Sequence, residues 1–373
     1  MKYCQRCILP DTRPGIRIGD DGICSGCVGH NAKQNVIDWD ARLRDWEQVV
    51  ERAKERSRGY DCLIPVSGGK DSTWQVVKCL EYGLNPLAVT WKTPGRTELG
   101  QRNLDNLVRL GVDHVDYQIN PKVERKFMYQ SLVRFGSTAV PMHMALFSIP
   151  LKLAVRYEIP LVIWGENAAL EYGGTDEDRF GYRLNSEWIR KYGVVHGTTA
   201  QDWISPELTA KELTPYFVPT DEELSQAGVD AVFLGCYFSW DPEESLRVAT
   251  EHGFQSREEG PRTGYWNYAD LDDDFISLHH FLKWHKFGMT RTWDNLSVEI
   301  RNGRLTRDEA ISVLRARGDE TPHEDIEKFC AFAGITKAHF FDVIERYRNP
   351  QLWTRRAGAW EIEGFLISDW NWS

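Results

Sequence analysis

Residues 62–72 read Cys-Leu-Ile-Pro-Val-Ser-Gly-Gly-Lys-Asp-Ser, an apolar run followed by a polar turn with two glycines. The run 62–66 has the length of a short buried strand, and the apolar spacing after the turn predicts a helix. The two glycines let the backbone approach an anion closely, and the start of the helix offers unpaired N–H groups. Ser67 and Ser72 add hydroxyl groups, and Lys70 adds a cation. The stretch therefore predicts a phosphate-binding loop between a strand and a helix.

Asp71 is unusual in such a loop, because a bare anion site should avoid a carboxylate. A bound Mg²⁺ would resolve the conflict by pairing with Asp71 and with phosphate oxygens. The loop is neither a Walker A motif nor a dinucleotide-binding Gly-x-Gly-x-x-Gly motif. The alternative is a tight turn with solvated polar residues, but the strand–turn–helix context favours a phosphate loop.

Strands and helices alternate on the C-terminal side of this loop. Further strands are expected at 86–91, 114–119, 160–164 and 231–234, and helices at 72–82, 98–110, 121–135 and 143–157. Such alternation requires crossover connections, which place strands in parallel and cover both faces of the sheet. The expected fold class is therefore α/β, with a parallel, doubly wound sheet.

Composition divides the chain into four parts. Residues 1–30 are rich in Cys, Gly, Pro and Asp and cannot form an apolar core of their own, so something other than burial must fix them. An amphipathic helix links them, over residues 31–58, to the α/β domain at 59–240, which carries an insertion at about 165–230. Residues 241–373 are mainly helical, with helix-start patterns at 241–244 and 306–309.

Half of the eight cysteines lie in the first 27 residues, as Cys4-Gln-Arg-Cys7 and Cys24-Ser-Gly-Cys27. Each pair can present two thiolates to one ion, and both pairs together complete a closed tetrahedral Zn²⁺ site. Such a site has no open position for catalysis, so the zinc would serve to fold this segment. An iron–sulfur cluster or redox thiols are the alternatives. The scattered cysteines are expected to be small packing residues: Cys62, Cys79, Cys236 and Cys330.

The composition argues against several classes of protein. The net charge is −10, and no Lys/Arg cluster of the kind that binds nucleic acid is visible. No apolar run of ~18 residues occurs, and the first residues lack the apolar stretch of a signal peptide. The sequence therefore predicts a cytoplasmic protein with no membrane segment, in which cysteines serve as thiols or metal ligands.

The strand followed by Ser67-Gly68-Gly69-Lys70-Asp71-Ser72 resembles the PP-loop of the N-type ATP pyrophosphatases, which split ATP into AMP and pyrophosphate. The resemblance implies that the loop holds the departing pyrophosphate and that adenine lies over the ends of the first two strands. It also implies that Lys70, Asp71 and Glu166 act in catalysis, with Glu166 holding Mg²⁺ or orienting the substrate. For Glu166 an ordinary polar loop is the alternative. The candidate ATP-binding residues are Pro65, Val66, Ser67, Gly68, Gly69, Lys70, Asp71, Ser72, Thr90, Trp91, Gly165 and Asn167.

Several segments resemble one subgroup, the N-acetyl sugar amidotransferases of bacterial surface-polysaccharide biosynthesis, including O-antigen and lipopolysaccharide. These segments are 3–14, 22–27, 60–72, 164–167 and 286–291. The last of them lacks the second Phe-Gly pair of the subgroup, and it adds Lys286 and Arg291 as candidate nucleotide or pyrophosphate contacts.

The resemblance implies amidine formation as the reaction. The acetamido carbonyl of a UDP-linked sugar, or of a sugar acid such as pseudaminic acid, would be adenylated, and ammonia would then displace AMP. The ammonia would come from a separate glutaminase subunit, because Cys236 has no linked His that would make it a glutaminase nucleophile. Aromatic and basic residues of the insertion are candidate sugar and anion contacts, with packing and solvated charge as the alternatives: Tyr172, Trp188, Tyr192, Trp203, Arg179, Arg183 and Arg190.

Two other functions compete with this interpretation. A tRNA-modifying PP-loop enzyme, such as a thiolase or a lysidine synthetase, is the first, because some thiolases also carry N-terminal zinc. The acidic composition and the absence of a second cysteine pair argue against it. A zinc-ribbon adaptor with a degenerate nucleotide domain is the second, and the intact loop argues against that one.

Overall fold

A computed structural model of the chain describes residues 1–356 and 358–372. At its centre lies a five-stranded parallel sheet in the order β3-β2-β1-β4-β5. The strands are β1 (Cys62–Pro65), β2 (Pro86–Trp91), β3 (Asp113–Tyr117), β4 (Leu161–Trp164) and β5 (Asp230–Phe233). The chain runs from β1 to one edge and then returns to the other side of β1, so the strand order reverses between β1 and β4. Ligands of open α/β sheets bind outside the carboxyl ends of the strands at such a reversal.

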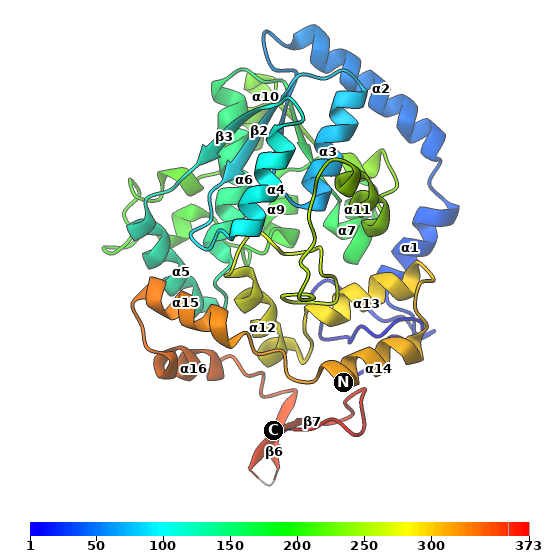
Figure 1. Cartoon of the computed structure of the whole chain (residues 1–373), viewed down its shortest axis with the longest axis vertical. Coiled ribbons are helices and arrows are strands. Elements are labelled where there is room, and N and C mark those ends of the chain that lie inside the picture. Colours follow the sequence, from blue (N-terminus) through cyan, green and yellow to red (C-terminus); the bar gives the residue numbers. More distant parts are fainter. Residues whose placement is uncertain (357, 373) are drawn as a thin grey trace.

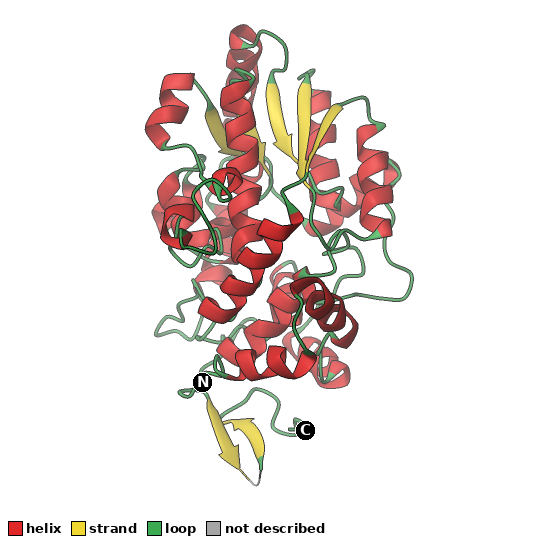
Figure 2. Ribbon diagram, turned by 90° about the vertical axis from the view of Figure 1, so that its left-hand side faces the viewer, coloured by secondary structure: helices red, strands yellow, loops and turns green. Residues whose placement is uncertain are grey.

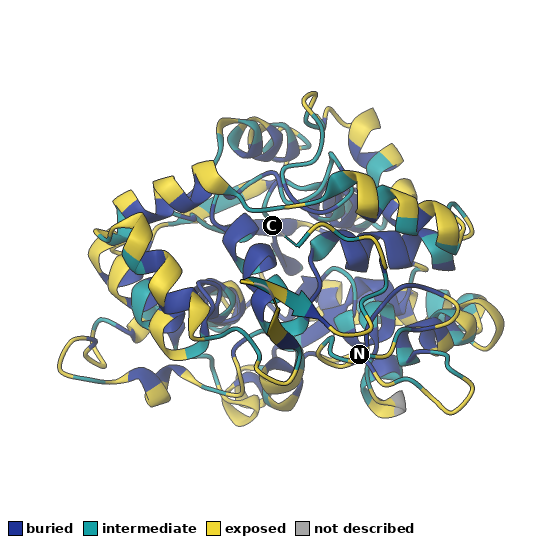
Figure 3. Ribbon diagram, turned by 90° about the horizontal axis from the view of Figure 1, so that it is seen from below, coloured by how far each residue is buried: buried dark blue, intermediate teal, exposed yellow. Residues whose placement is uncertain are grey.

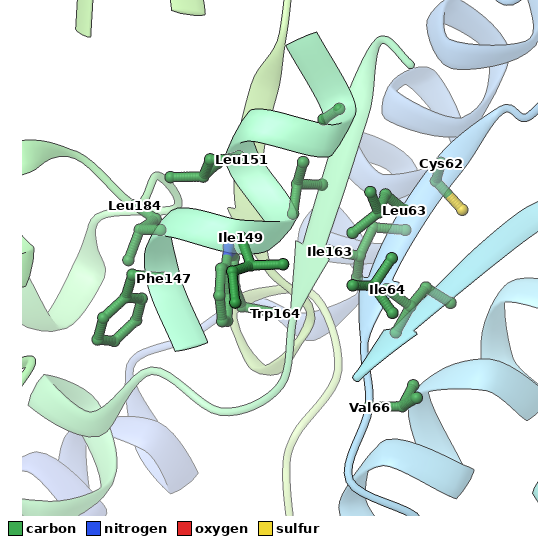
Figure 4. Close-up of a cluster of buried hydrophobic side chains, with 14 of the residues drawn as sticks. Cys62, Leu63, Ile64, Val66, Phe147, Ile149, Leu151, Ile163, Trp164 and Leu184 are labelled. Carbon is green, nitrogen blue, oxygen red and sulfur yellow. The ribbon is translucent and has the colours of Figure 1, made fainter. Parts of the chain in front are cut away.

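Helices cover both faces of this sheet, and Figure 2 shows the strands between them. Right-handed crossovers place α3 (Lys70–Glu81) and α4 (Glu98–Val108) on one face, and α6 (Val140–Arg156) on the other. Because both faces are covered, β1 and β4 are buried along their whole length and read as continuous apolar runs. Figure 4 shows Phe147, Ile149 and Leu151 of α6 in the buried cluster that also contains Leu63 and Ile163. The predicted α/β class is confirmed.

Local signals placed most of the element boundaries. Asp38 caps α2 (Trp39–Arg56) by accepting the Ala41 N–H at 2.9 Å. Asp241 caps α11 (Pro242–Glu251), and α14 (Arg307–Arg317) has the predicted capping box. Helix α3 begins two residues before the predicted start, because Gly69 is already its N-cap. The remaining elements before β4 are α1 (Ser25–Asn35) and α5 (Pro121–Phe135).

The segment between β4 and β5 is an insertion between two adjacent strands. It contains α7 (Ala168–Tyr172), α8 (Asp176–Phe180), α9 (Ser186–Tyr192), η1 (Ala200–Trp203), η2 (Thr214–Tyr216) and α10 (Asp221–Ala227). Its later part is anchored in the main core, where Leu208, Leu213 and Tyr216 are at most 1% exposed. After β5 the chain makes the short turn η3 (Leu234–Cys236) and then enters α11.

The C-terminal part is helical and ends in a hairpin. Its elements are α12 (Ile276–Phe287), α13 (Arg291–Arg301), α14, α15 (His323–Ala333), α16 (Lys337–Glu345), β6 (Trp353–Arg356) and β7 (Ala359–Ile362). The hairpin was not predicted, because two four-residue strands carry little periodicity. Seen from below, these helices turn buried faces inward and exposed faces outward (Figure 3). Among the described residues, no helix combines the length and apolarity needed to cross a bilayer.

The N-terminal segment packs against this helical part, and the two meet at the lower end of Figure 1. Ile8 and Leu9 are at most 1% exposed and share a second core with Trp293 and Leu296 of α13 and Leu314 of α14. The expectation that something other than burial fixes residues 1–30 is therefore incomplete. Their apolar residues lack a core within the segment and obtain one from a distant part of the chain.

Candidate active site and metal centre

The predicted phosphate loop connects the end of β1 to the start of α3. Gly68 has a φ of +85°, and a Cβ added to it would lie 2.5 Å from the backbone nitrogen of Leu104. The Gly69 N–H donates to Ser67 Oγ at 3.2 Å, and Ser72 Oγ donates to the Gly69 carbonyl at 3.0 Å. The first glycine is thus required by conformation and by close packing on α4, and the turn is held by its own polar groups.

Lys70 is buried among aromatic rings. Its Nζ lies 2.6 Å from Asp71 Oδ2, and the ring centroids of Trp240, Tyr268 and Trp266 are 5.5, 5.7 and 6.0 Å away. The indole N–H of Trp240 donates to Asp71 Oδ1 at 2.8 Å. The rings stabilise the ammonium through cation–π attraction when no phosphate is bound. Sequence reasoning missed this cage, because its three members come from 240–268, and only the high tryptophan content pointed toward them.

Glu166 lies at the end of β4, and the structure brings it near Lys70 and Asp71. Burial, together with the charge of Asp71, raises the pKa of Glu166 to about 7, and the charge of Lys70 opposes the shift. A divalent cation would stabilise Glu166 in its ionised form beside the charge of Asp71. The three predicted catalytic residues therefore converge at the carboxyl edge of the sheet.

The other predicted ATP contacts on β1 and β2 also lie at this edge. Thr90 Oγ1 donates to the Val66 carbonyl at 2.8 Å, and the Trp91 indole donates to Glu124 at 2.8 Å. Pro65 is the last residue of β1. Because these side-chain polar groups already have protein partners, a nucleotide would meet backbone atoms and ring faces here.

Gly165 and Asn167 follow β4. The Gly165 carbonyl accepts the Gly235 N–H at 3.0 Å. Asn167 is fully buried, its amide donates to the Asp178 carbonyl at 2.9 Å, and its carbonyl accepts from the Trp188 indole at 3.2 Å. These bonds fix the insertion to the end of β4, and a direct contact between Asn167 and ATP would require breaking them.

Arg291 of α13 lies near this edge, although it is far away in sequence. Its guanidinium is 5.8 Å from the ring centroid of Tyr172 and 3.6 Å from Asp270. Burial raises the pKa of Tyr172, the charge of Arg291 opposes the shift, and the charges of Glu166 and Asp71 add to it. The resemblance suggested Arg291 as a nucleotide or pyrophosphate contact. In the structure its guanidinium lies beside Tyr172 and Asp270, and the nucleotide contact stays a prediction.

Lys286 lies deeper, and its Nζ is 3.5 Å from the Phe135 carbonyl. Burial, together with the charge of Lys283, lowers its pKa to about 8. Of the candidates in the insertion, Trp188 and Trp203 are packing residues of the main core. Arg183 is exposed and pairs with Asp230 at 3.3 Å, at the amino end of β5 and thus at the edge opposite the phosphate loop.

The four N-terminal cysteines form one buried cluster whose ligand atoms all lie within 4.8 Å of one another. The sulfurs of Cys4 and Cys27 are 3.9 Å apart, and those of Cys7 and Cys24 are 3.6 Å apart. A tetrahedron of sulfurs about 2.3 Å from zinc has edges of about 3.8 Å, so the cluster fits Zn²⁺. The Cys7 N–H points at Cys4 Sγ at 3.4 Å, as in a knuckle that orients thiolates.

Arg301 is a further residue of this centre that sequence reasoning missed. Its guanidinium lies 3.9 Å from Cys24 Sγ and donates to the Glu171 carbonyl at 3.0 Å. A Cβ on Gly26 would collide with it, which explains the glycine between the two cysteines of the second pair. The cation offsets the negative charge of a four-thiolate site and connects it to α13 and α7.

Comparison with known proteins identifies the C-terminal part. Residues 259–365 match the family model "LPS biosynthesis protein WbpG-like, C-terminal domain". This segment is WbpG-like. It contains α12 to β7, and thus Lys286 and Arg291. No curated protein matches the chain.

Three solved structures resemble the fold weakly. A predicted subunit of tRNA methyltransferase from Methanocaldococcus jannaschii is 16% identical, with a TM-score of 0.27, over 51% of this chain and 75% of that one. NMN synthetase from Francisella tularensis is 15% identical, with a TM-score of 0.28, over 58% and 93%. NH3-dependent NAD synthetase from Campylobacter jejuni is 17% identical, with a TM-score of 0.28, over 58% and 94%. These likenesses are too weak to carry functional information.

Proposed function

We propose that this protein is an ATP-dependent sugar amidotransferase of lipopolysaccharide biosynthesis. It adenylates the acetamido carbonyl of a sugar nucleotide, or of a related sugar acid, and lets ammonia displace AMP to form an acetamidino group. The observation that carries the proposal is the convergence of Lys70, Asp71 and Glu166 beside an intact PP-loop, next to a WbpG-like segment.

The reaction has two displacement steps and no redox change. First, the acetamido oxygen attacks the α-phosphorus of ATP, and the bond to pyrophosphate breaks. Then ammonia attacks the acetamido carbon, the carbon–oxygen bond breaks, and the oxygen leaves as part of AMP. The amidine is basic and keeps the additional proton as an amidinium ion.

The residues of the site have separate roles in these steps. Gly68, Gly69 and the start of α3 present N–H groups to the leaving pyrophosphate, and Lys70 supplies a cation. Asp71 and Glu166 would hold Mg²⁺, which neutralises phosphate charge when it is bound. The protein therefore acts chiefly by positioning and by charge stabilisation.

The nitrogen would come from glutamine through a separate glutaminase subunit. Within the described residues, the thiols outside the cysteine cluster are all buried. Burial raises the pKa of Cys236 to about 12, and its Sγ donates to the Gly181 carbonyl at 3.3 Å, so it is a poor nucleophile. The same burial argues against sulfur transfer to tRNA by these thiols.

The test uses the purified protein with ATP, Mg²⁺, an ammonium salt and a panel of UDP-diacetamido sugars whose acetamido oxygen carries a heavy isotope. With oxygen-18 as the label, the expected result is labelled AMP together with a product about three mass units lighter than the labelled substrate, because the heavy oxygen is replaced by an NH group. Unlabelled AMP would show that water or another group is adenylated and would reject the proposal. AMP that forms only after bulk tRNA is added would replace it with a tRNA-modifying function.

A further inference from the structure

Helix α12 carries a row of basic side chains next to its buried face. His279, Lys283 and Lys286 are four and three residues apart, so they lie on one side of the helix. The adjoining side, with Leu278, Phe281 and Leu282, is buried in a core shared with α15 and α16. His143 of α6 faces the row, with its ring centroid 6.0 Å from that of His279.

The cations around this row have few carboxylate partners. Asp294 forms ion pairs with three of them. Its carboxylate lies 2.6 Å from Arg13 Nε, 3.2 Å from Lys283 Nζ and 3.9 Å from Arg291. These cations hold the pKa of Asp294 well below its usual range, so this carboxylate is ionised. The fourth cation, Lys286, is near a backbone carbonyl and Lys283.

With Asp270 added as a partner of Arg291, four cations face two carboxylates, which leaves an excess positive charge of about two. The Nε of Arg291 faces Asp270 Oδ2 at 3.6 Å, which is just beyond hydrogen-bond distance, so this ion pair is a loose one. Burying like charges together is unfavourable in the free protein, and a bound anion removes that cost. Burial lowers the pKa values of Lys283 and Lys286, and neighbouring cations act in the same direction, while Asp294 opposes the shift at Lys283.

The cluster adjoins the adenylation site. The guanidinium groups of Arg13 and Arg291 lie 5.6 and 5.8 Å from the ring of Tyr172, and Tyr172 in turn feels the charges of Glu166 and Asp71. In Figure 2 the strand arrows point toward the C-terminal helices. The phosphate loop and the cluster therefore both lie beyond the carboxyl ends of the strands.

We infer that Arg13, His143, His279, Lys283, Lys286 and Arg291 form the binding site for the anionic group of the acceptor. That group is the diphosphate of a nucleotide sugar or the carboxylate of a sugar acid. The site holds the acceptor by this anion and leaves its acetamido carbonyl directed at Asp71 and Glu166. The inference rests on the proposed function for the identity of the acceptor, and it assigns a role to the WbpG-like segment in substrate recognition.

The experiment measures binding by calorimetry without ATP, for the whole protein and for Lys283→Gln and Lys286→Gln. The probes are UDP, UDP-N-acetylglucosamine and N-acetylneuraminate, and Lys337→Gln, an exposed change in the same segment, is the control. Each test variant should bind the preferred probe about tenfold to a hundredfold more weakly, because a charge-assisted hydrogen bond is lost. The affinity for ATP should stay within about twofold of wild type. Lys286→Gln should also melt no lower than wild type without ligand, because it removes a charge that has no carboxylate partner, whereas Lys283→Gln gives up the ion pair with Asp294.

The outcomes separate the two proposals. Preference for UDP compounds identifies the diphosphate as the anchor, and preference for N-acetylneuraminate identifies the carboxylate. Weaker ATP binding with unchanged probe binding would assign the lysines to the triphosphate and overturn the inference, as would a wild-type protein that binds none of the probes. Lysine-dependent probe binding in a protein that forms no amidine would keep the anion site and reject the proposed function.

Discussion

Asp71 is held between two residues that approach it from opposite sides. Its Oδ1 accepts the indole N–H of Trp240 at 2.8 Å, and its Oδ2 lies 2.6 Å from Lys70 Nζ. Trp240 precedes α11, so the segment that follows β5 fixes the orientation of a carboxylate on α3. The loop is thus arranged for its chemistry by a part of the chain that contains no recognisable motif.

Replacing Asp71 by Asn should lower the rate of AMP formation by about 10²–10³-fold, because the charge that balances Lys70 and a bound cation is lost. The amide keeps the size and the acceptor for Trp240, so the melting temperature should change little. Trp240→Phe is the companion variant: it removes the indole N–H that Asp71 accepts, together with part of the ring beside Lys70, and it should cost at least about tenfold. AMP release by Asp71→Asn at the wild-type rate would exclude Asp71 from the mechanism.

Glu166 should make the stability of the free protein depend on pH. Its pKa of about 7 in the folded chain lies above the ordinary value, so the folded state binds more protons than the unfolded state between these two values. The stability that Glu166 contributes is present at low pH and is lost as the pH rises through about 7.

Glu166→Gln lacks this loss. The free energy of unfolding is measured by urea titration without ATP or Mg²⁺. The difference between Glu166→Gln and wild type should shift in favour of the variant by on the order of 2 kcal/mol from about pH 4 to pH 8. Glu222→Gln, at an exposed position on α10, is the control and should show a constant difference. Parallel curves for Glu166→Gln and wild type would contradict the raised pKa of this carboxylate.

The architecture could be predicted because its signals are local. The apolar runs of β1 and β4, the caps at Asp38 and Asp241, and the glycines of the loop are each readable within a few residues. The cysteine pairs were readable for the same reason, since metal-ligand spacing is short-range. The sequence analysis misplaced the start of α3 and missed the C-terminal hairpin, because no strong periodicity marks the boundaries of these elements.

Much of the site could not be predicted, because its members meet only through tertiary packing. The aromatic rings around Lys70 and the guanidinium beside Cys24 come from segments more than a hundred residues away. No spacing rule connects Trp266 to Lys70, or Arg301 to Cys24. The contact between Asn167 and ATP that the resemblance implies stays a prediction, and the internal partners of its amide could not be read from the sequence.

Zinc loss should loosen the C-terminal helices as well as the N-terminal segment. Cys4→Ser removes one of four ligands, and residues 1–30 share a core with Trp293 and Leu314. The variant should lose bound zinc, melt about 5 °C lower or more, and exchange amide hydrogens faster in α13 and α14. Cys330→Ser, at a buried cysteine outside the cluster, should keep its zinc. Full zinc content in Cys4→Ser, measured by elemental analysis, would refute the four-cysteine centre.

The two glycines of the phosphate loop should respond differently to the same added methyl group. Gly68→Ala meets both a φ of +85° and the backbone of Leu104 at 2.5 Å, which α4 cannot relieve without moving. It should lose about 1–3 kcal/mol of stability from the backbone conformation alone, and ATP binding should fall more than tenfold as the loop shifts.

Gly69→Ala is the matched control for this pair. Gly69 has a φ of −68°, which alanine adopts freely, and its added Cβ would meet only Ser67 Oγ at 3.2 Å. This variant should keep a melting temperature close to that of wild type and lose at most about tenfold in ATP affinity, measured by calorimetry with a non-hydrolysable analogue. Equal effects of the two substitutions would mean that the loop is held less tightly against α4 than the contact with Leu104 requires, and that its shape forms only when the nucleotide binds.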